Sequence, residues 1–301
     1  RALPAQILER RADTPGALAA ALAACVMAPG PIRALAAGLS LAAEDASDAP
    51  ARPARIQAAA AALRNAAPLS DALRDEVSTL LVAAPGSLGQ LVAAHATAQI
   101  VARAAQAERI AAVLARCNSK GATVATGPGL GATFLGDNAP GHEGLRRAGV
   151  AHLLIAEGPS VDPRGVTRLG GLDAADVVRI NLPATLMSEA QLTLAIARGE
   201  ACALLLASDA VAADGSAVLL AGGVALAAAA AARKIPILLV AALSSAASPD
   251  SEALARRIAE AETTELHAAA SGSVASRSVA AGVTVRAPRY EILAAGVAER
   301  I

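Results

Sequence analysis

Residues 201–243 read ACALLLASDAVAADGSAVLLAGGVALAAAAAARKIPILLVAAL, and this stretch decides the fold. An apolar run at Ala203–Ala207 is followed, after an acidic loop, by a segment of helical length at Val218–Arg233. Pro236 ends that segment, and Ile237–Val240 is a second apolar run. Continuous apolar strands on either side of a helix are typical of a βαβ unit, whose parallel strands are buried on both faces. We therefore expect a strand, a helix and a second, parallel strand.

The remainder of the chain from Gly121 onward shows the same alternation of short apolar runs and helical segments. The expected strands are Thr123–Thr126, His152–Ala156, Val177–Asn181, Ala203–Ala207, Ile237–Val240 and Gly282–Val285. The expected helices are Leu130–Ala148, Arg164–Leu172, Ser188–Arg198, Val218–Arg233 and Ser251–Ala270. This alternation predicts an α/β fold with a doubly wound, mainly parallel, Rossmann-like sheet.

The first third of the chain has a different, Ala-rich and helical pattern. Helices are expected at Leu3–Arg11, from Pro15 to about Met27, from Pro31 onward, at 71–83 and at Leu88–Arg116, with a polar linker at 43–55. Proline is favourable in the first turn of a helix, because its missing N–H has no partner there. We predict a helical N-terminal domain at 1–116 and a Rossmann-like α/β domain at 117–301.

Composition narrows the classes of function. The 26 basic and 26 acidic residues cancel, and aromatic residues make up 1% of the chain, so direct binding to nucleic acid is not expected. Cys25, Cys117 and Cys202 are few and odd in number, which is typical of reduced thiols in a cytoplasmic protein. The uncharged run 217–232 is too short and too rich in Ala and Gly to cross a membrane. Because the sequence begins at Arg1 and not at methionine, a removed targeting segment stays an open alternative.

Two stretches place candidate ligand-binding groups after strands. GPGLGATFLG at 127–136 follows the first strand, and Gly127, Gly129 and Gly131 could let the backbone approach a phosphate. The spacing does not fit G-x-G-x-x-G, and an ordinary strand-to-helix turn explains the glycines as well. Asp209 and Asp214 follow the strand at Ala203–Ala207, at the edge where open α/β sheets bind ligands. The four histidines show no metal-ligand spacing, so neither a metal nor a cofactor is expected.

The order of residues at 207–216, then Gly222, Ala-Leu-Ala at 225–227 and Lys-Ile-Pro-Ile-Leu-Leu-Val at 234–240, resembles one family. It is similar to the regulatory subunits of translation initiation factor 2B and to two enzyme relatives, methylthioribose-1-phosphate isomerase and ribose-1,5-bisphosphate isomerase. The resemblance is strongest over 201–243 and weaker over 120–200 and 283–298. It implies a helical domain before the α/β domain, and dimers formed through the α/β domain.

The resemblance also implies a set of catalytic parts, of which this chain keeps one. The isomerases carry a His-Cys-Asn run after the first strand, where this chain has Gly127, Pro128 and Gly129. Cys117-Asn118 also spells Cys-Asn, but it precedes the strand. The phosphate-binding Asn-Lys pair of the isomerases aligns with Leu219-Leu220. Asp209 matches their proton-shuttling acid, and a carboxylate buried at a strand end can have a pKa suited to that task.

Three further positions follow from the resemblance. Glu157 stands in the loop where the family has an Arg that grips phosphate; that adjacent Arg is missing here, and Arg164 or Arg168 could replace it as a clamp. A solvated charged loop is the simpler interpretation. Asn181 is expected at the end of the third strand, where the isomerases carry Asp.

The joint loss of thiol, Arg and Lys favours a non-catalytic subunit, because such groups act together in a transition state. We therefore expect a regulatory or structural subunit of a guanine-nucleotide exchange assembly, in contact with other initiation factor 2B subunits and initiation factor 2. A sugar-phosphate or nucleotide pocket could survive in it as a sensor. The alternative is an aldose–ketose isomerase of a sugar 1-phosphate that uses Asp209, Arg164 and the glycine turn. A third alternative is a diverged structural subunit of an unrelated assembly.

Overall fold

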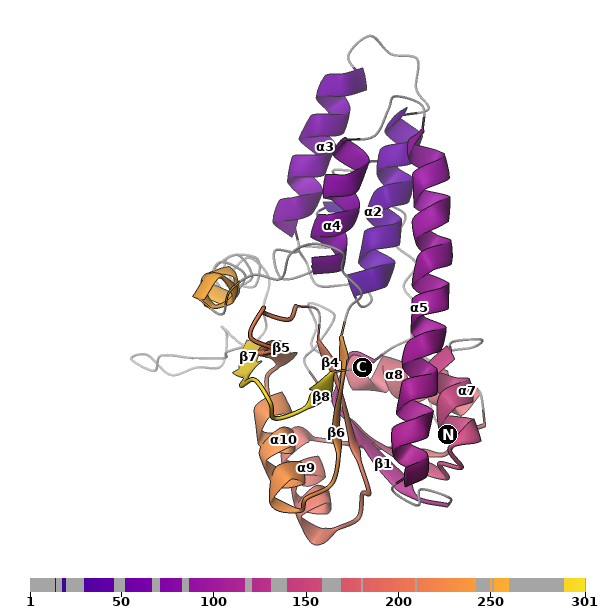
Figure 1. Ribbon diagram of the computed structural model, residues 1–301, viewed down its shortest axis with the longest axis vertical. Helices are drawn as coiled ribbons and strands as arrows, with labels where there is room; N and C mark the ends of the chain where they lie inside the picture. The colour runs from indigo at the N-terminus through magenta and orange to yellow at the C-terminus, as the bar shows by residue number, and fades with distance from the viewer. Residues whose placement is uncertain are drawn as a thin grey trace, which may run out of the picture.

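A computed structural model shows a bundle of helices beside an α/β unit, joined by one long helix (Figure 1). The structure describes residues 14, 18–19, 30–45, 52–66, 71–82, 87–116, 121–130, 140–158, 169–179, 181–208, 210–241, 250, 252–259 and 290–300. The expected helix Leu3–Arg11, most of the one from Pro15 to Met27, and the expected strand Gly282–Val285 lie outside these residues.

The helical bundle consists of α2 (Gly30–Asp45), α3 (Arg52–Ala66), α4 (Asp71–Leu81) and the first half of α5 (Leu88–Arg116). The predicted helix Leu88–Arg116 is confirmed residue for residue, and the one at 71–83 is confirmed to within two residues. The bundle core is formed by leucine, valine and alanine, among them the fully buried Leu41, Leu63 and Leu73. The expected linker 43–55 is shorter than predicted, because α2 reaches Asp45 and α3 begins at Arg52.

The main sheet is parallel and doubly wound, as predicted. Its strands are β1 (Thr123–Thr126), β2 (His152–Ala156), β3 (Ala184–Met187), β4 (Leu204–Ser208), β6 (Ile237–Ala241) and β8 (Glu299–Arg300). They lie in the order β3-β2-β1-β4-β6-β8. Four of the six expected strands are confirmed to within one residue at each end, because they are continuous buried apolar runs.

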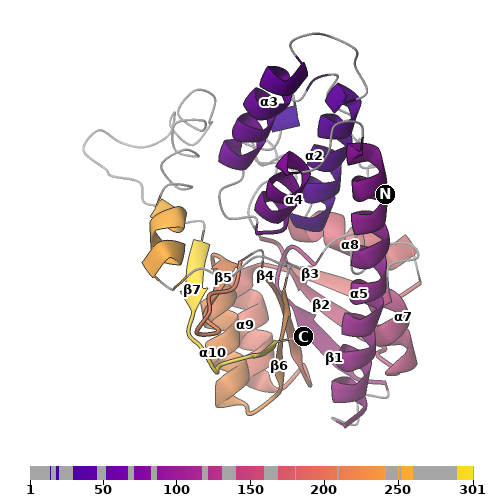
Figure 2. The ribbon, with the colours of Figure 1, turned by 45° about the horizontal axis from the view of Figure 1, so that its top comes forward.

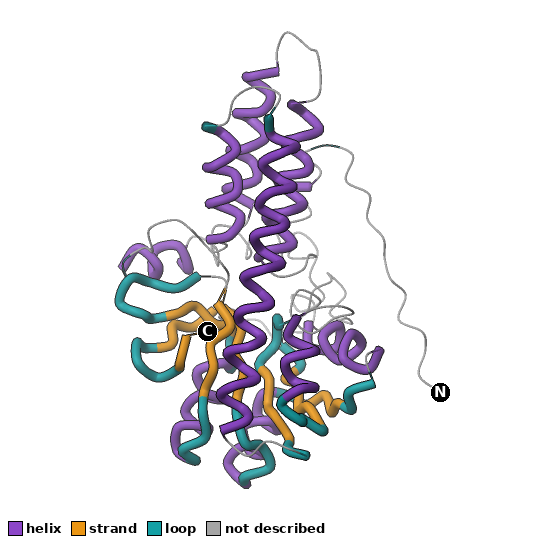
Figure 3. Tube along the Cα trace, turned by 45° about the vertical axis from the view of Figure 1, so that its right-hand side comes forward, coloured by secondary structure: helices purple, strands orange, loops and turns teal. Residues whose placement is uncertain are grey.

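Helices cover both faces of this sheet (Figure 2). One face carries the second half of α5 together with α7 (Pro140–Arg147) and α8 (Leu169–Arg179); the other carries α9 (Glu189–Arg198) and α10 (Gly223–Ala232). Ile110, Val113 and Leu114 of α5 belong to the same hydrophobic cluster as strand residues of β1 and β2. The long helix therefore contributes to two cores. Figure 3 shows this helix running from the bundle to the sheet. The division at 116/117 stays a prediction.

Two predictions about the α/β part are wrong. Val177–Asn181 is not a strand, because it includes the end of α8. The third strand begins at Ala184, three residues after Asn181. The helix expected from Val218 begins at Gly223, because Ala217–Leu220 is strand β5, which pairs antiparallel with β7 (Tyr290–Leu293).

The other helical predictions are only partly covered. The helix Ser188–Arg198 is confirmed as α9 with Ser188 as its cap. For Arg164–Leu172 the structure describes α8, Leu169–Arg179, which continues beyond the predicted end. For Leu130–Ala148 the structure describes α7, and for Ser251–Ala270 it describes a helix at 252–259. Over the described residues, no helix is both long and apolar enough to cross a membrane.

Candidate functional site at the carboxyl edge of the sheet

The strand order reverses direction between β1 and β4, which lie side by side although the chain passes from β3 to β4. In open α/β sheets the ligand crevice lies outside the carboxyl ends of the strands at such a reversal. The segments that follow β1, β2 and β4 all reach this edge. It is therefore where a site would be built.

The turn after β1 uses its own backbone donors. The Gly127 amide donates to the Leu205 carbonyl at 2.8 Å, and the Gly129 amide donates to Oδ2 of Asp173 at 2.8 Å. Gly129 has φ +94°, a conformation that favours glycine, and Asp173 is 1% exposed. Both amides are thus occupied within the chain, so a phosphate at this turn would need other donors. Gly131 lies outside the described residues.

The loop after β2 is packed against two helices, α8 and α9. Glu157 is half-buried, and its carbonyl accepts from the Gly170 amide at the start of α8, at 2.8 Å. A Cβ at Gly170 would lie 1.8 Å from the Ala156 carbonyl oxygen, so only glycine permits this approach. The Gly158 amide donates to Oε1 of Glu189, the first residue of α9, at 2.7 Å. The candidate clamps Arg164 and Arg168 lie outside the described residues.

The segment after β4 contains the candidate acid. Asp209 itself lies outside the described residues, but Ser208 and Ala210 on either side are buried. The Ser208 hydroxyl donates to the Ala210 carbonyl at 2.8 Å. Asp214 is exposed and accepts from the amide and the hydroxyl of Ser216, at 2.8 and 2.6 Å. These contacts give Asp214 a turn-forming role of the kind common for Asp before Gly-Ser.

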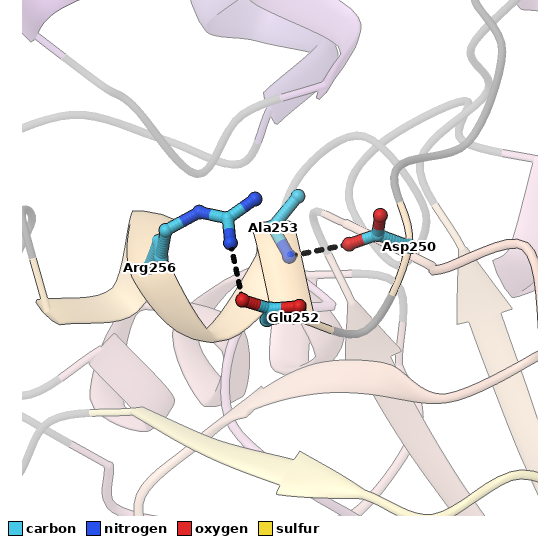
Figure 4. A network of polar contacts seen from close by, with 4 residues as sticks. All are labelled: Asp250, Glu252, Ala253 and Arg256. Atoms are coloured by element: carbon cyan, nitrogen blue, oxygen red, sulfur yellow. Dashed lines mark hydrogen bonds and ion pairs between the residues drawn. The ribbon is translucent and has the colours of Figure 1, made fainter.

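A helix at 252–259 packs against this segment. Leu254 lies in one apolar cluster with Ala210, Ala212 and Val218, and Tyr290 of β7 packs against that cluster. The first turn of the helix is capped by Asp250, whose Oδ1 accepts from the Ala253 amide at 2.6 Å (Figure 4). An ion pair of 2.7 Å between Glu252 and Arg256 follows one turn later.

Two polar residues of α5 that sequence reasoning did not select reach the same edge. Nε2 of Gln106 donates to the Ala241 carbonyl at 3.0 Å, and Nη1 of Arg103 donates to Oε1 of Gln106 at 2.8 Å. Ala241 is the last residue of β6 and pairs with Ser208 of β4. Arg103 and Gln106 are both buried. The signal that could have identified this pair in the sequence is two polar residues three positions apart on an Ala-rich helix.

The start of α10 is occupied by a carboxylate of the chain. The Val224 amide donates to Oε2 of Glu291 at 3.0 Å, and Glu291 is brought there by the pairing of β7 with β5. Free N–H groups and the helix dipole make a helix N-terminus attractive to anions. Here Glu291 supplies the negative charge.

The structure brings together Gly127, Gly129 and Glu157, because Gly158 lies directly against Pro128 of the β1 turn. Asn181 is not part of this group. It is an exposed residue with φ +58° that precedes β3, so it lies at the amino edge, opposite to the predicted place. Cys117 lies outside the described residues. Among the residues that are described, no cluster of three or more His, Cys, Asp or Glu could hold a metal ion.

Comparisons of sequence with protein-family models and with curated proteins find no match. Comparisons of structure do. The chain is similar to 5-methylthioribose 1-phosphate isomerase from Pyrococcus horikoshii, with a TM-score of 0.63 and 18% identity, over 93% of this chain and 80% of that one. It is also similar to subunit delta of translation initiation factor eIF-2B from A. fulgidus, with a TM-score of 0.59 and 13% identity, over 94% and 84%.

This chain has the isomerase–eIF-2B fold. A translation initiation factor eIF-2B from Pyrococcus horikoshii matches as well, with a TM-score of 0.58 and 15% identity, over 74% of this chain and 78% of that one. The resemblance at 201–243 implied a helical region followed by a doubly wound sheet. That fold is confirmed. Because both isomerases and initiation factors share the isomerase–eIF-2B fold, the choice between them rests on the site.

Proposed function

We infer that this chain is a non-catalytic subunit of an assembly of the eIF-2B type and works through protein–protein contact. In this proposal the α/β part, residues 117–301, forms contacts with another copy or with other subunits. The helical part, residues 1–116, forms the other of the two structural units of the chain. Initiation factor 2 is the expected partner of the whole assembly, by analogy with the eIF-2B subunits that share the fold.

The observation that carries this proposal is the use of the chain's own carboxylates at the carboxyl edge. Asp173, Glu189 and Glu291 each accept from a backbone amide of this edge, those of Gly129, Gly158 and Val224. Backbone amides at strand-to-helix turns are the donors that a phosphate group would use. A phosphorylated sugar would have to displace these carboxylates or approach them as a like charge, which is unfavourable in either case.

The catalytic parts are incomplete for the same reaction. Pro128 stands where the resemblance implies a thiol, and the neighbouring amides of Gly127 and Gly129 are both engaged in the fold. Asp209 alone could move a proton but could not hold the substrate. Groups that act as a unit lose nearly all their effect when one is removed. A vestigial pocket that senses a sugar phosphate or a nucleotide would have to bind the phosphate through donors other than the amides of Gly129, Gly158 and Val224.

The alternative is an aldose–ketose isomerase of a sugar 1-phosphate. It is favoured by the retained acid at Asp209, which follows the last strand residue, Ser208, at the carboxyl edge of the sheet. In this reading Arg164 and the turn at Gly127–Gly131 would bind the phosphate.

An isomerisation assay separates the two functions. The full chain is incubated with 5-methylthioribose 1-phosphate or ribose 1,5-bisphosphate, and formation of the ketose is followed by NMR. We expect no turnover above that of the Asp209→Asn variant. Turnover that the Asp209→Asn variant abolishes would establish the isomerase instead.

The assembly itself is tested by solution mass. Light scattering of the full chain, alone and mixed with candidate eIF-2B subunits, should give a mass above that of the 29.5 kDa monomer. A monomer under every condition would remove the proposed mode of action, whatever the isomerisation assay gives.

A further inference from the structure

A buried carboxyl group links two helices of the bundle that otherwise meet mainly through a third. Glu76 of α4 is 6% exposed, and its Oε2 contacts Nδ1 of His95 on α5. The His95 side chain is 33% exposed, so it lies between the bundle interior and solvent. Both α4 and α5 pack extensively on α2. The Glu76–His95 contact therefore joins α4 to α5 across α2.

The helix between them is shaped to admit this carboxyl group. A Cβ at Gly38 of α2 would lie 2.7 Å from Oε1 of Glu76 and 3.0 Å from Cγ2 of Val92. The missing side chain at Gly38 is thus the space that the carboxyl group fills. Oε1 of Glu76 is buried and has no hydrogen-bond partner among the described residues. A charged carboxylate with one polar contact in such a place is costly.

The charged groups of the surrounding helices do not offset that cost, as far as their side chains are described. On α4, the neighbouring Asp75 is half-buried and of like charge. On α2, Asp45 lies at the far end, where its Oδ2 accepts from the Leu88 amide. On α3, Arg55 is exposed. On α5, Arg103 lies about two turns beyond His95 and donates to Gln106.

The protonation state of Glu76 is therefore linked to folding of the bundle. Burial raises the pKa of Glu76 above its ordinary value of 4.5, and the hydrogen bond and charge of His95 act in the opposite direction without cancelling the effect of burial. A group whose pKa is raised on folding contributes stability below its unfolded pKa. That contribution is lost as the pH rises through the folded value.

We propose that Glu76, His95 and Gly38 form a proton-controlled clasp, which holds α5 against α4 when the carboxyl group is protonated and loosens the bundle when it ionises. In the closed state the carboxyl group of Glu76 is neutral, so no carboxylate charge is buried beside Gly38. In the open state the carboxylate draws water toward the space above Gly38. The parallel sheet does not take part.

Hydrogen exchange of the full chain tests the clasp. Local opening of α4 and of residues 88–100 is measured at several pH values, after correction for intrinsic exchange, with β2 as an internal reference. For one coupled proton, the opening constant of these helices should rise by as much as about tenfold per pH unit between the unfolded and the folded pKa of Glu76, and should level off above the folded pKa. The opening constant of β2 should not follow this dependence.

Glu76→Gln keeps the shape of the side chain without its charge. This variant should hold the bundle closed at every pH and abolish the pH dependence of opening. Asp75→Asn removes the neighbouring carboxylate and should leave that dependence as in the wild type. His95→Gln should move the loosening to higher pH, because it removes the group that favours the ionised carboxylate. The proposal is overturned if Glu76→Gln retains the wild-type pH dependence, or if β2 opens in parallel with the bundle.

Discussion

Single carboxylates decide how the carboxyl edge of the sheet is held together. Asp173, Glu189 and Glu291 come from three different elements, α8, α9 and β7, and each meets a backbone amide of a loop or helix start. Asp173 and Glu189 were not selected from the sequence, because each lies far along the chain from its partner. Contacts of this kind follow from the fold and not from a local motif.

The buried Asp173 gives the sharpest test at this scale. Asp173→Ala removes the acceptor of the half-buried Gly129 amide and should destabilise the chain by about 1–3 kcal/mol, because a hydrogen bond to a carboxylate is lost. Asp173→Asn keeps an acceptor oxygen and should cost less. Both are measured by urea unfolding.

The control for Asp173 is Asp214, which also accepts from a backbone amide but is exposed. Asp214→Ala should cost clearly less than Asp173→Ala, because water can replace the lost hydrogen bond. If the two alanine variants lose equal free energy of unfolding, burial of Asp173 does not determine how much its hydrogen bond contributes to stability.

Secondary-structure elements were predictable where the apolar pattern is continuous. β1, β2, β4 and β6 are runs of buried residues, and α5 is a long periodic helix, so their bounds follow from the sequence. β3 is an edge strand in which Thr185 and Leu186 are exposed, so it has no such run. The β-branched pair Val177-Val178 imitated a strand instead, although Val177 faces the core from α8.

The misplacement of β3 explains the one candidate site residue that the structure corrects. Once Val177–Asn181 is taken as a strand, Asn181 falls at its carboxyl end; with β3 at Ala184–Met187 it falls before the strand. The missed β5 has a similar origin, because AVLL runs directly into an alanine-rich helix. The pair Gly222-Gly223 was the available signal that the helix begins later.

The beginning of α9 provides a test at the scale of one element. Ser188 and Gln191 form a reciprocal capping box, in which each side chain accepts from the backbone amide of the other. Ser188→Ala should destabilise the chain by about 1 kcal/mol, since one helix donor loses its acceptor. Ser188→Asp should restore most of that loss. Thermal unfolding of the three chains measures both effects, and a neutral Ser188→Ala would show that the cap carries no stability.

At the scale of the molecule, the described residues form separate cores that share one helix. The bundle core and the cluster on one face of the sheet are both reached by α5, through Leu88 and Val92 at one end and Ile110 and Leu114 at the other. This arrangement raises the question of whether 1–116 and 117–301 unfold as one unit or as two. The proposed clasp at Glu76 requires that the bundle can loosen by itself.

Two leucine truncations answer that question. Leu63 of α3 and Leu114 of α5 are both fully buried, in the bundle core and in the sheet cluster, respectively. Leucine-to-alanine changes at such positions cost about 2–5 kcal/mol. Leu63→Ala should increase hydrogen exchange in α2 and α4 and leave β1 and β2 protected, whereas Leu114→Ala should do the reverse.

Exposed leucines serve as matched controls for these truncations. Leu39 of α2 and Leu194 of α9 are 63% and 50% exposed, so their replacement by alanine should change exchange little in either part. If Leu63→Ala and Leu114→Ala increase exchange equally throughout the chain, α5 couples the two cores into one cooperative unit. In that case, a local change in the bundle would reach the carboxyl edge through Arg103 and Gln106, the residues by which α5 is hydrogen-bonded to the end of β6.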